Sequence, residues 1–261
     1  MITPAFHLSI LEQYIDCFEV NGRILIEQLE KELDKDSVDI YPYISLYTLD
    51  VICETAMGVS VNVQKNKNSK YVKNIQQLCE VLFNRAFGFL KRFDFFYNFT
   101  IDNYKELKAL KEIHSHTNSV IDARRKELEI KPKTEIGIVK DDLGRKRKMD
   151  FLDILLQSSI DGEPLSREDI REEVDTFMFE GHDTSSSAIS FTIFLLANHP
   201  EVQMQALKEQ QNIFCDDITR NATYNDLQAM KYLELVIKES LRLYPPVAII
   251  GRSTNKDVEF K

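Results

Sequence analysis

One stretch of the chain limits its possible folds more than any other, because residues 166–198 are predicted to form a single helix. Ser166 suits an N-cap, Asp169 follows at the spacing of a capping box, and Leu165 and Ile170 are spaced as a hydrophobic staple. No proline interrupts the stretch before Pro200, so the predicted helix is far longer than the average helix. A chain built around such a helix is expected to be mainly α.

The composition agrees with a mainly α fold with minor β structure. The 261 residues include only 8 glycines and 7 prolines, which argues against a loop-rich β fold. Hydrophobic residues make up 43% and charged residues 29%, as in ordinary globular proteins. The net charge of −9 disfavours nucleic-acid binding, since phosphate contacts need clustered basic side chains.

Further helices are predicted on both sides of the long one. Helical periodicity covers Ile10–Leu33, Asp39–Met57 with a stop at Gly58, Lys70–Phe89 and Ile101–Leu128. Residues 130–149, with the basic run 145–148, read as an exposed loop, after which the helical pattern resumes at Phe151. Helices are also expected from Pro200, after Thr223 and over residues 231–244, and residues 247–260 suit one or two strands.

A dense aromatic segment lies between two of these predicted helices. It contains six phenylalanines and Tyr97 within residues 87–99. We expect these rings to pack in the core under a helix junction, and a ligand channel is the alternative.

The cysteines and the apolar runs restrict the class of protein further. Cys17, Cys53, Cys79 and Cys215 show neither zinc-site nor disulfide spacing, so reduced and mostly buried thiols are expected. The longest apolar run, residues 188–197, is about half of what a membrane-spanning helix needs. No signal peptide is visible at Met1.

The middle of the long helix breaks the rules of helix composition. Phe177, Glu180, Thr184 and Ser187 share one face, with Asp183 beside them. Gly181 and four consecutive hydroxyl residues, 184–187, are unfavourable inside a helix, and such conflicts are expected at functional sites. An acid and an alcohol next to a gap in a helix can pass protons. The alternative is an ordinary solvated or helix-packed face in which Asp183 pairs with a lysine elsewhere in the chain. His182 is expected to be a surface or packing histidine and not a metal ligand.

A second motif follows near the end of the chain. Glu239 and Arg242 stand three residues apart, so they can pair along one helix. Tyr244-Pro245-Pro246 comes directly after them, and Arg252 then offers a guanidinium that can bind a carboxylate.

Together these residues resemble a known family. Residues 173–184, EVDTFMFEGHDT, look like the oxygen-binding central helix of cytochromes P450, and most of all like its fourth family, which includes fatty-acid omega-hydroxylases and insect members. Glu239-x-x-Arg242 with Leu243-Tyr244-Pro245-Pro246 is similar to the E-x-x-R helix of that superfamily. The likeness runs from about Thr3 to the end of the chain. It implies a P450-type fold in which residues 1–261 are the central part of a single domain, truncated at both ends.

The resemblance also implies roles for individual residues. Asp183 and Thr184 would be the catalytic acid–alcohol pair that guides protons to oxygen at the haem. Gly181 would leave room for oxygen and substrate, and Glu180 would be able to form an ester with a haem methyl group. Arg252 would contact a haem propionate, and Glu239 with Arg242 would belong to a buried charge network. The substrate pocket would be lined by Phe177, Val247 and Ala248.

Several family features are missing from this sequence. The glycine-rich loop with the axial cysteine is expected beyond Arg252, outside this chain, so no metal ligand is assigned. The amino-terminal anchor, the tryptophan–arginine pair before Thr3 and the later arginine of the charge network are also absent. Ser185 stands where the family usually has a second threonine. We therefore expect a partial sequence.

The activity implied is insertion of one oxygen atom into a hydrophobic substrate, such as a fatty-acid-like compound, a hormone or a xenobiotic. Haem would be the cofactor, with electrons from NADPH through cytochrome P450 reductase. The full-length parent would lie on the cytosolic face of the endoplasmic reticulum membrane, anchored by a segment absent here. The alternatives are a truncated, non-catalytic isoform or a helical interaction protein, and an unrelated helical scaffold.

The missing axial cysteine leads to a testable expectation. Thiolate ligation drives O–O cleavage in this class, so the 261-residue chain alone should neither hold haem in an active state nor hydroxylate a substrate. Reduced samples with added haem and carbon monoxide should show no thiolate-type absorbance band. Appearance of that band would overturn the expectation.

Overall fold

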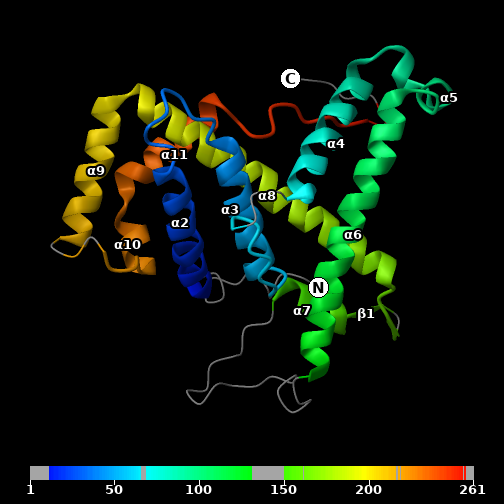
Figure 1. Cartoon of the computed structure of the whole chain (residues 1–261), viewed down its shortest axis with the longest axis horizontal. Coiled ribbons are helices and arrows are strands. Elements are labelled where there is room, and N and C mark those ends of the chain that lie inside the picture. The colour runs from blue at the N-terminus through cyan, green and yellow to red at the C-terminus, as the bar shows by residue number, and fades with distance from the viewer. Residues whose placement is uncertain are drawn as a thin grey trace. The chain divides into compact units, whose positions relative to one another are not determined.

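A computed structural model describes residues 12–65, 69–130, 150–160, 162–215, 217, 219–254 and 256, and it confirms a mainly α chain (Figure 1). The minor β structure is one antiparallel pair, β1 (Ser159–Ile160) with β2 (Glu163–Pro164). The loop predicted at 130–149 falls outside the described residues from 131 on, and so does the basic run 145–148.

The chain divides into two compact units, which are described separately. The first unit contains residues 1–183 and 221–224, and the second contains residues 184–220 and 225–261. The division falls within helix α8 (Arg167–Asn198), between Asp183 and Thr184.

Most elements of the first unit precede α8 in the sequence. The predicted helices are confirmed, with ends that differ by a few residues. The elements are η2 (Glu12–Tyr14), α2 (Ile15–Glu30), α3 (Tyr41–Thr55), α4 (Lys70–Phe87), η3 (Leu90–Arg92), α5 (Asp94–Tyr97), α6 (Ile101–Ile130) and α7 (Phe151–Gln157).

The core of the first unit buries the beginning of α8. Ile170, Val174 and Met178 project from α8 into a cluster of apolar side chains from α3, α4, α6 and α7. Leu49 and Cys53 of α3 are completely buried in this cluster. Burial of apolar surface is the main favourable term in folding, so these contacts hold the first half of α8 in the unit.

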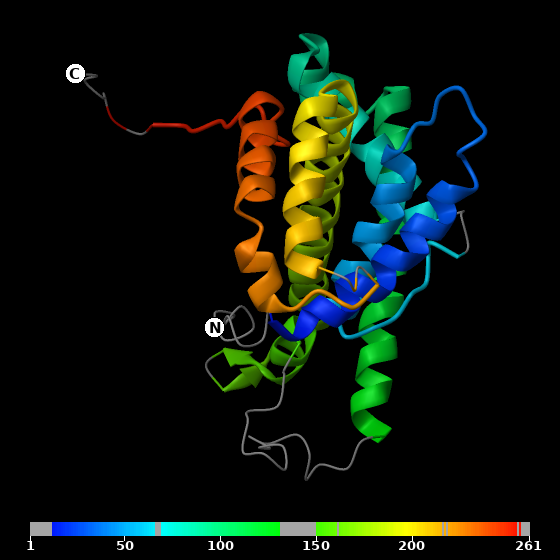
Figure 2. The ribbon, with the colours of Figure 1, turned by 90° about the vertical axis from the view of Figure 1, so that its left-hand side faces the viewer.

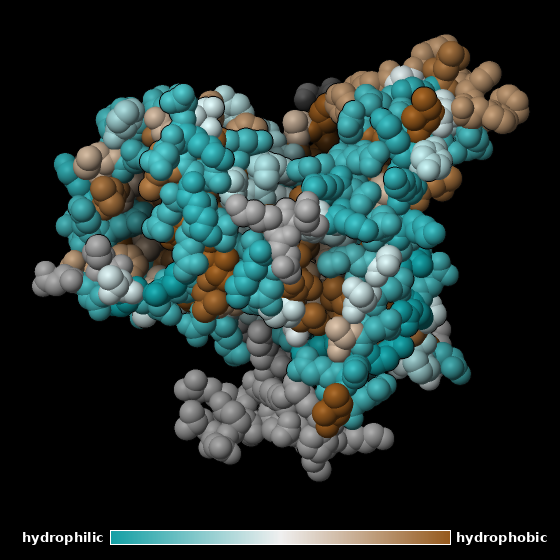
Figure 3. All heavy atoms as spheres, viewed as in Figure 1, coloured by the Kyte–Doolittle hydropathy of each residue, from teal (hydrophilic) through white to brown (hydrophobic). Residues whose placement is uncertain are grey.

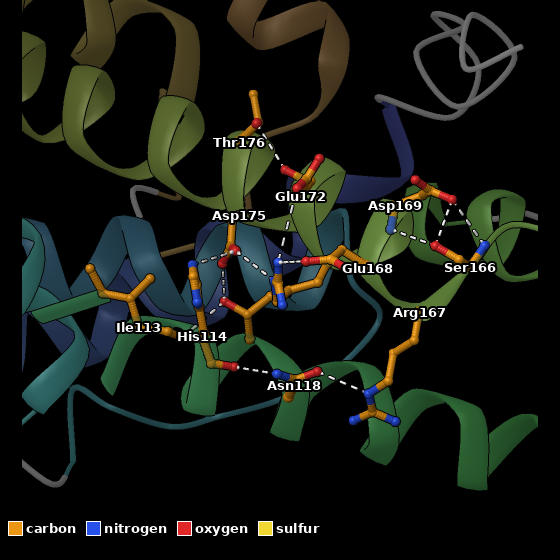
Figure 4. Close-up of polar contacts among 12 residues, drawn as sticks. Ile113, His114, Asn118, Ser166, Arg167, Glu168, Asp169, Glu172, Asp175 and Thr176 are labelled. Atoms are coloured by element: carbon orange, nitrogen blue, oxygen red, sulfur yellow. Dashed lines mark hydrogen bonds and ion pairs between the residues drawn. The ribbon is translucent and has the colours of Figure 1, made fainter. Parts of the chain in front are cut away.

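The start of α8 has the predicted capping box (Figure 4). The backbone N–H of Asp169 donates to Ser166 Oγ at 3.1 Å, and the backbone N–H of Ser166 donates to Asp169 Oδ2 at 3.1 Å. These bonds satisfy backbone donors that a helix end otherwise leaves without partners.

Polar side chains also join α6 to the first half of α8, as Figure 4 shows. Thr117 donates to Asp175 at 2.5 Å, and His114 Nε2 lies 3.6 Å from the same carboxylate. Arg167 donates to Asp122 at 2.8 Å. Burial raises the pKa of Asp175, while the hydrogen bond from Thr117 opposes that rise.

A buried arginine connects α6 to α7 and to the turn after α3. Arg124 Nε and Nη2 donate to the two carboxylate oxygens of Asp153 at 2.6 and 2.7 Å, and Nη2 also donates to Asp150 at 3.0 Å. Its Nη1 donates to the carbonyl of Gly58 at 3.0 Å. Gly58 has φ +66°, and a Cβ there would lie 2.4 Å from Asp150 Oδ2, so the predicted helix stop needs glycine for two reasons.

The second unit contains the rest of α8, α9 (Pro200–Phe214), most of α10 (Tyr224–Ala229) and α11 (Lys231–Leu243). Helices α9 and α11 pack together. The backbone N–H groups of Tyr232 and Leu233 donate to the Glu209 carboxylate at 2.6 and 2.9 Å. An acid of α9 therefore caps the first turn of α11, where the helix dipole favours negative charge.

Two expectations about local structure are wrong. The aromatic segment is not core, because only Tyr97 is buried there and the six phenylalanines are exposed. Apolar side chains gather at the upper right of Figure 3, where Figure 1 places α5. In the tail, residues 247–254 form no strand, since a strand requires a hydrogen-bonded neighbour and the described residues provide none.

The longest apolar run of the sequence, residues 188–197, is too short for a membrane-spanning helix. Among the described residues, no helix is both long enough and apolar enough to cross a bilayer.

The Arg124 cluster generates a prediction about stability. Arg124→Ala should lower the free energy of unfolding by roughly 3–5 kcal/mol, because two buried carboxylates lose their counter-ion. Urea unfolding followed by circular dichroism measures the change. Lys126→Ala, at an exposed position of the same helix, should stay within about 0.5 kcal/mol of the unmodified chain. Equal effects of the two substitutions would contradict the role given to Arg124.

Candidate functional site

The middle of α8 approaches α3 closely at Gly181. A Cβ added to Gly181 would lie 2.7 Å from Ile52 Cδ1 and 3.0 Å from Ile52 Cγ1. Any larger residue would force Ile52 to move, so close packing of the two helices accounts for the glycine. The family resemblance implies that Gly181 leaves room for oxygen and substrate, and this role stays a prediction.

His182 lies at the same crossing and is completely buried. Its Nε2 forms a 2.7 Å hydrogen bond with Ser45 Oγ, and Thr48 Oγ1 donates to its backbone carbonyl at 3.1 Å. Burial lowers the pKa of His182 from the ordinary 6.5 to about 4, although Asp183 opposes this shift. The interpretation of His182 as a packing histidine is confirmed, and it is neutral at physiological pH.

Asp183 is half-buried and has a partner on α3. Tyr41 donates its hydroxyl hydrogen to Asp183 Oδ1 at 2.8 Å. The expected partner in an ordinary packed face was a lysine, and the structure provides a phenol instead. This hydrogen bond holds the Asp183 side chain in one orientation.

The other predicted residues of α8 have different surroundings. Glu180 is exposed, and Thr184, the first residue of the second unit, is half-buried. Phe177 packs against Phe151 of α7, with ring centroids 3.9 Å apart. This contact places Phe177 beside the core of the first unit, and its predicted role in lining a substrate pocket remains a prediction.

In the second unit, Glu239 and Arg242 form the predicted pair. Arg242 Nε and Nη2 donate to the two Glu239 oxygens, both at 2.7 Å. The expectation that this pair is buried is wrong for the described structure, because the side chains are 56% and 67% exposed. In the described part of the chain no element covers them. The pairing lowers the pKa of Glu239 through the hydrogen bond from Arg242.

The end of α11 lies beside the second half of α8. The ring of Tyr244 stacks on Phe191, with centroids 4.8 Å apart and an angle of 10° between the planes. Val247, Ala248 and Arg252 follow on the exposed tail. Arg252 donates to the carbonyl of its neighbour Gly251, and no carboxylate of the described residues pairs with it.

The predicted residues are therefore divided between the units. Phe177, Glu180, Gly181 and Asp183 lie in the first unit, and Thr184, Glu239, Arg242, Val247, Ala248 and Arg252 lie in the second. Within the first unit, the crossing with α3 gathers the polar contacts around residues 181–183.

Sequence reasoning missed the α3 side of this crossing. Tyr41, Ser45, Thr48 and Ile52 are spaced by four, three and four residues, so they form one stripe along α3. The signal was a row of three hydroxyl residues on an apolar helix. This row of hydroxyl residues could not be linked to α8 from the sequence, because no local sequence pattern indicates which helices pack against each other.

Each unit carries residues whose chemistry suits the haem binding that the resemblance implies. Arg252 lacks an acidic partner among the described residues and suits a propionate, and Asp183 with Thr184 supplies an acid next to an alcohol. Within the described residues, no group of three histidine, cysteine or acidic side chains is arranged to hold a metal ion.

None of the four cysteines, all within the described residues, forms a disulfide, as expected for reduced thiols. Burial raises the pKa of Cys53 and of Cys79, which disfavours the thiolate form. Cys17 donates to Glu54 at 3.3 Å, and Cys215 donates to the carbonyl of Asn212 at 3.2 Å. Of the four, Cys53 is buried, Cys17 and Cys79 are half-buried and Cys215 is exposed, so the expectation of mostly buried thiols is wrong.

The buried histidine predicts how stability depends on pH. Because the pKa of His182 is lower in the folded state, its contribution is complete above pH 6.5 and is lost as the pH falls towards 4. This titration should cost about 3 kcal/mol of unfolding free energy. His182→Gln removes the titrating group and should reduce the pH dependence of urea unfolding between pH 6.5 and 4. An NMR pKa of 6 or above for His182 would contradict this.

Comparison with known proteins identifies the family. The sequence model of the family described as Cytochrome P450 matches residues 1–261. The chain is 44% identical to Cytochrome P450 4d2 of Drosophila melanogaster over 269 residues, which cover 100% of this chain and 53% of that protein. It is 46% identical to Cytochrome P450 4d1 of Drosophila simulans, over 99% of this chain and 51% of that protein.

Probable cytochrome P450 4s3 of Drosophila melanogaster is 43% identical, over 99% of this chain and 51% of that protein. The chain thus spans about half the length of the curated relatives it matches. The match over its whole length excludes an unrelated helical scaffold and confirms the predicted likeness to the fourth P450 family. The chain belongs to the cytochrome P450 family.

Proposed function

We propose that this chain is the central part of a haem-thiolate monooxygenase that inserts one atom of dioxygen into a hydrophobic substrate. The observation that carries the proposal is the acid Asp183, which Tyr41 holds at 2.8 Å, directly before the alcohol Thr184 in the interior of α8. Family membership supports the same reaction class.

Asp183 is the proton donor and acceptor in this proposal. Tyr41 engages Oδ1, so the carboxylate is oriented, and proton transfer is assigned to Oδ2. Thr184, the next residue, carries a hydroxyl that can accept a proton from one group and donate to another. Neutral His182 does not compete for that proton, because its low pKa keeps it uncharged at pH 7.

Other residues are assigned to binding. Arg252 would bind a haem propionate, and Glu180, which is exposed on α8, would form the covalent ester with a haem methyl group. Glu239 and Arg242 would stabilise the fold around the cofactor, and the substrate would contact Phe177, Val247 and Ala248. When bound, haem would supply the activation of dioxygen, which an axial thiolate promotes.

The proposal also covers the substrate class, the source of electrons and the cellular location of the whole protein. The substrate class is fatty-acid-like compounds, hormones or xenobiotics, and electrons come from NADPH through cytochrome P450 reductase. The parent protein is assigned to the cytosolic face of the endoplasmic reticulum membrane. Family membership supports these assignments, since redox partner and compartment are shared widely in such enzymes.

A truncated, non-catalytic isoform or helical interaction protein is the second candidate. The exposed phenylalanines of residues 87–99 favour it, because large exposed apolar patches often mark binding surfaces. The downstream reading frame separates the two candidates. A cysteine flanked by glycines supports the monooxygenase, and an in-frame stop supports the isoform.

The proton-transfer assignment is tested in the parent reading frame, expressed at the length of its relatives. Asp183→Asn should slow turnover of a bound fatty acid by about 10²–10⁴-fold, because the group that transfers the proton is removed. Haem content and the carbon monoxide spectrum should not change. Thr176→Ala removes an exposed hydroxyl of the same helix and is the matched control.

Unchanged turnover in Asp183→Asn would refute the assignment. In the same protein, Glu180→Ala tests the covalent bond, since haem should then become extractable with acidic organic solvent.

A further inference from the structure

Thr184 and Phe191 lie on the same face of α8. They are seven residues apart in the sequence, and this spacing places two residues on one side of an α-helix, two turns apart. At a rise of about 1.5 Å per residue, they are separated by about 10 Å along the helix axis. Both residues belong to the second unit. A group that packs on Phe191 therefore lies on the side of α8 that carries the alcohol of the proposed proton transfer.

Tyr244, the residue directly after α11, is the group that packs on Phe191. The two rings are stacked, with centroids 4.8 Å apart and an angle of 10° between their planes. The backbone N–H of Tyr244 also donates to the carbonyl of Ser240 at 2.8 Å. Tyr244 is therefore attached to the end of α11 through its backbone and to α8 through its ring.

Pro245 and Pro246 restrict the path of the chain after Tyr244. A proline ring fixes φ at roughly −65° and disfavours helical backbone in the residue before it. Tyr244 accordingly has φ −129° and ψ 72°, outside the helical range. Because the prolines limit the directions that the next residues can take, the position of the Tyr244 ring also determines where Val247 lies.

The tail that follows the prolines is exposed. Val247 is 57% exposed and Ala248 is exposed too, and the described residues 247–254 pair with no strand. Figure 2 shows this tail, in red, leading away from the end of α11. The start of the tail therefore depends on the stack between Tyr244 and Phe191.

We propose that Tyr244 is a positioning residue that acts through its stack on Phe191. It sets the distance between Thr184 and the proposed substrate contacts Val247 and Ala248. This inference rests on the proposed function, which assigns those three residues to proton transfer and substrate binding. The distance decides which carbon of a long apolar substrate lies next to Thr184, so Tyr244 determines where along the substrate oxygen is inserted.

The positioning role is measured first without catalysis, by ¹⁵N NMR relaxation of the 261-residue chain. Tyr244→Ala should lower the backbone order parameters of Val247 and Ala248 to below about 0.6, the range of flexible backbone. Tyr244→Phe keeps a ring that can stack and should leave them unchanged. Circular dichroism verifies that each variant folds. Equal order parameters in Tyr244→Ala and in the unmodified chain would overturn the positioning role.

The effect on oxygen insertion is measured in the parent reading frame, expressed at the length of its relatives and supplied with haem, cytochrome P450 reductase and NADPH. The probe is dodecanoic acid, and the readout is the ratio of the hydroxydodecanoic acid isomers. Tyr244→Ala and Phe191→Ala should each change this ratio about two- to tenfold, which is the size of effect expected from one aromatic pair. Because both substitutions remove the same contact, the double variant should change the ratio no further.

Two variants separate positioning from a general effect on structure. Tyr244→Phe should keep the isomer ratio of the unmodified parent. Phe194→Ala removes an exposed ring of the same helix and is the matched control, so it should also keep that ratio.

An unchanged ratio in Tyr244→Ala, or additive effects of the two single substitutions, would refute the role of Tyr244 in the reaction. If the haem-loaded parent does not hydroxylate dodecanoic acid, the proposed substrate class has failed, and the order parameters alone then decide whether Tyr244 positions the tail.

Discussion

The close contact between α3 and α8 at Gly181 is the constraint on which the candidate site depends. Without a side chain at this position, Ile52 can pack against the α8 backbone, and the two helices approach each other. That approach brings Ser45 and Thr48 to His182 and brings Tyr41 to Asp183. A larger residue would force the Ile52 side chain to move and would disturb the packing between the two helices.

Two neighbouring titratable residues have different roles because their surroundings differ. His182 faces the interior, where burial disfavours its charged form, so it acts as a neutral hydrogen-bonding residue of the core. Asp183 is only half-buried, and Tyr41 donates a hydrogen bond to its Oδ1 at 2.8 Å. One turn of α8 therefore combines a structural group with a chemically available one, as the proposed proton transfer requires.

The sequence pattern does not decide whether an apolar segment or a charged pair becomes buried. The phenylalanines of residues 87–99 have the composition of a core, yet they are exposed, because α5 and η3 lie at the end of a pair of long helices, α4 and α6. Glu239 and Arg242 pair as their spacing predicts, and their exposure depends on which other elements cover α11. The tail after Pro246 has strand composition but no neighbouring strand among the described residues.

The sequence by itself determined the elements whose signals are local. The capping box at Ser166 and Asp169, the stop at Gly58 and the start at Pro200 act within a few residues, so the helix boundaries and the E-x-x-R pair were predictable. Only the tertiary structure decided that Tyr41 is the partner of Asp183, that His182 is fully buried, and that Gly181 serves helix packing. These facts depend on which faces of α3 and α8 meet, and contacts between residues more than a hundred positions apart leave no local pattern in one sequence.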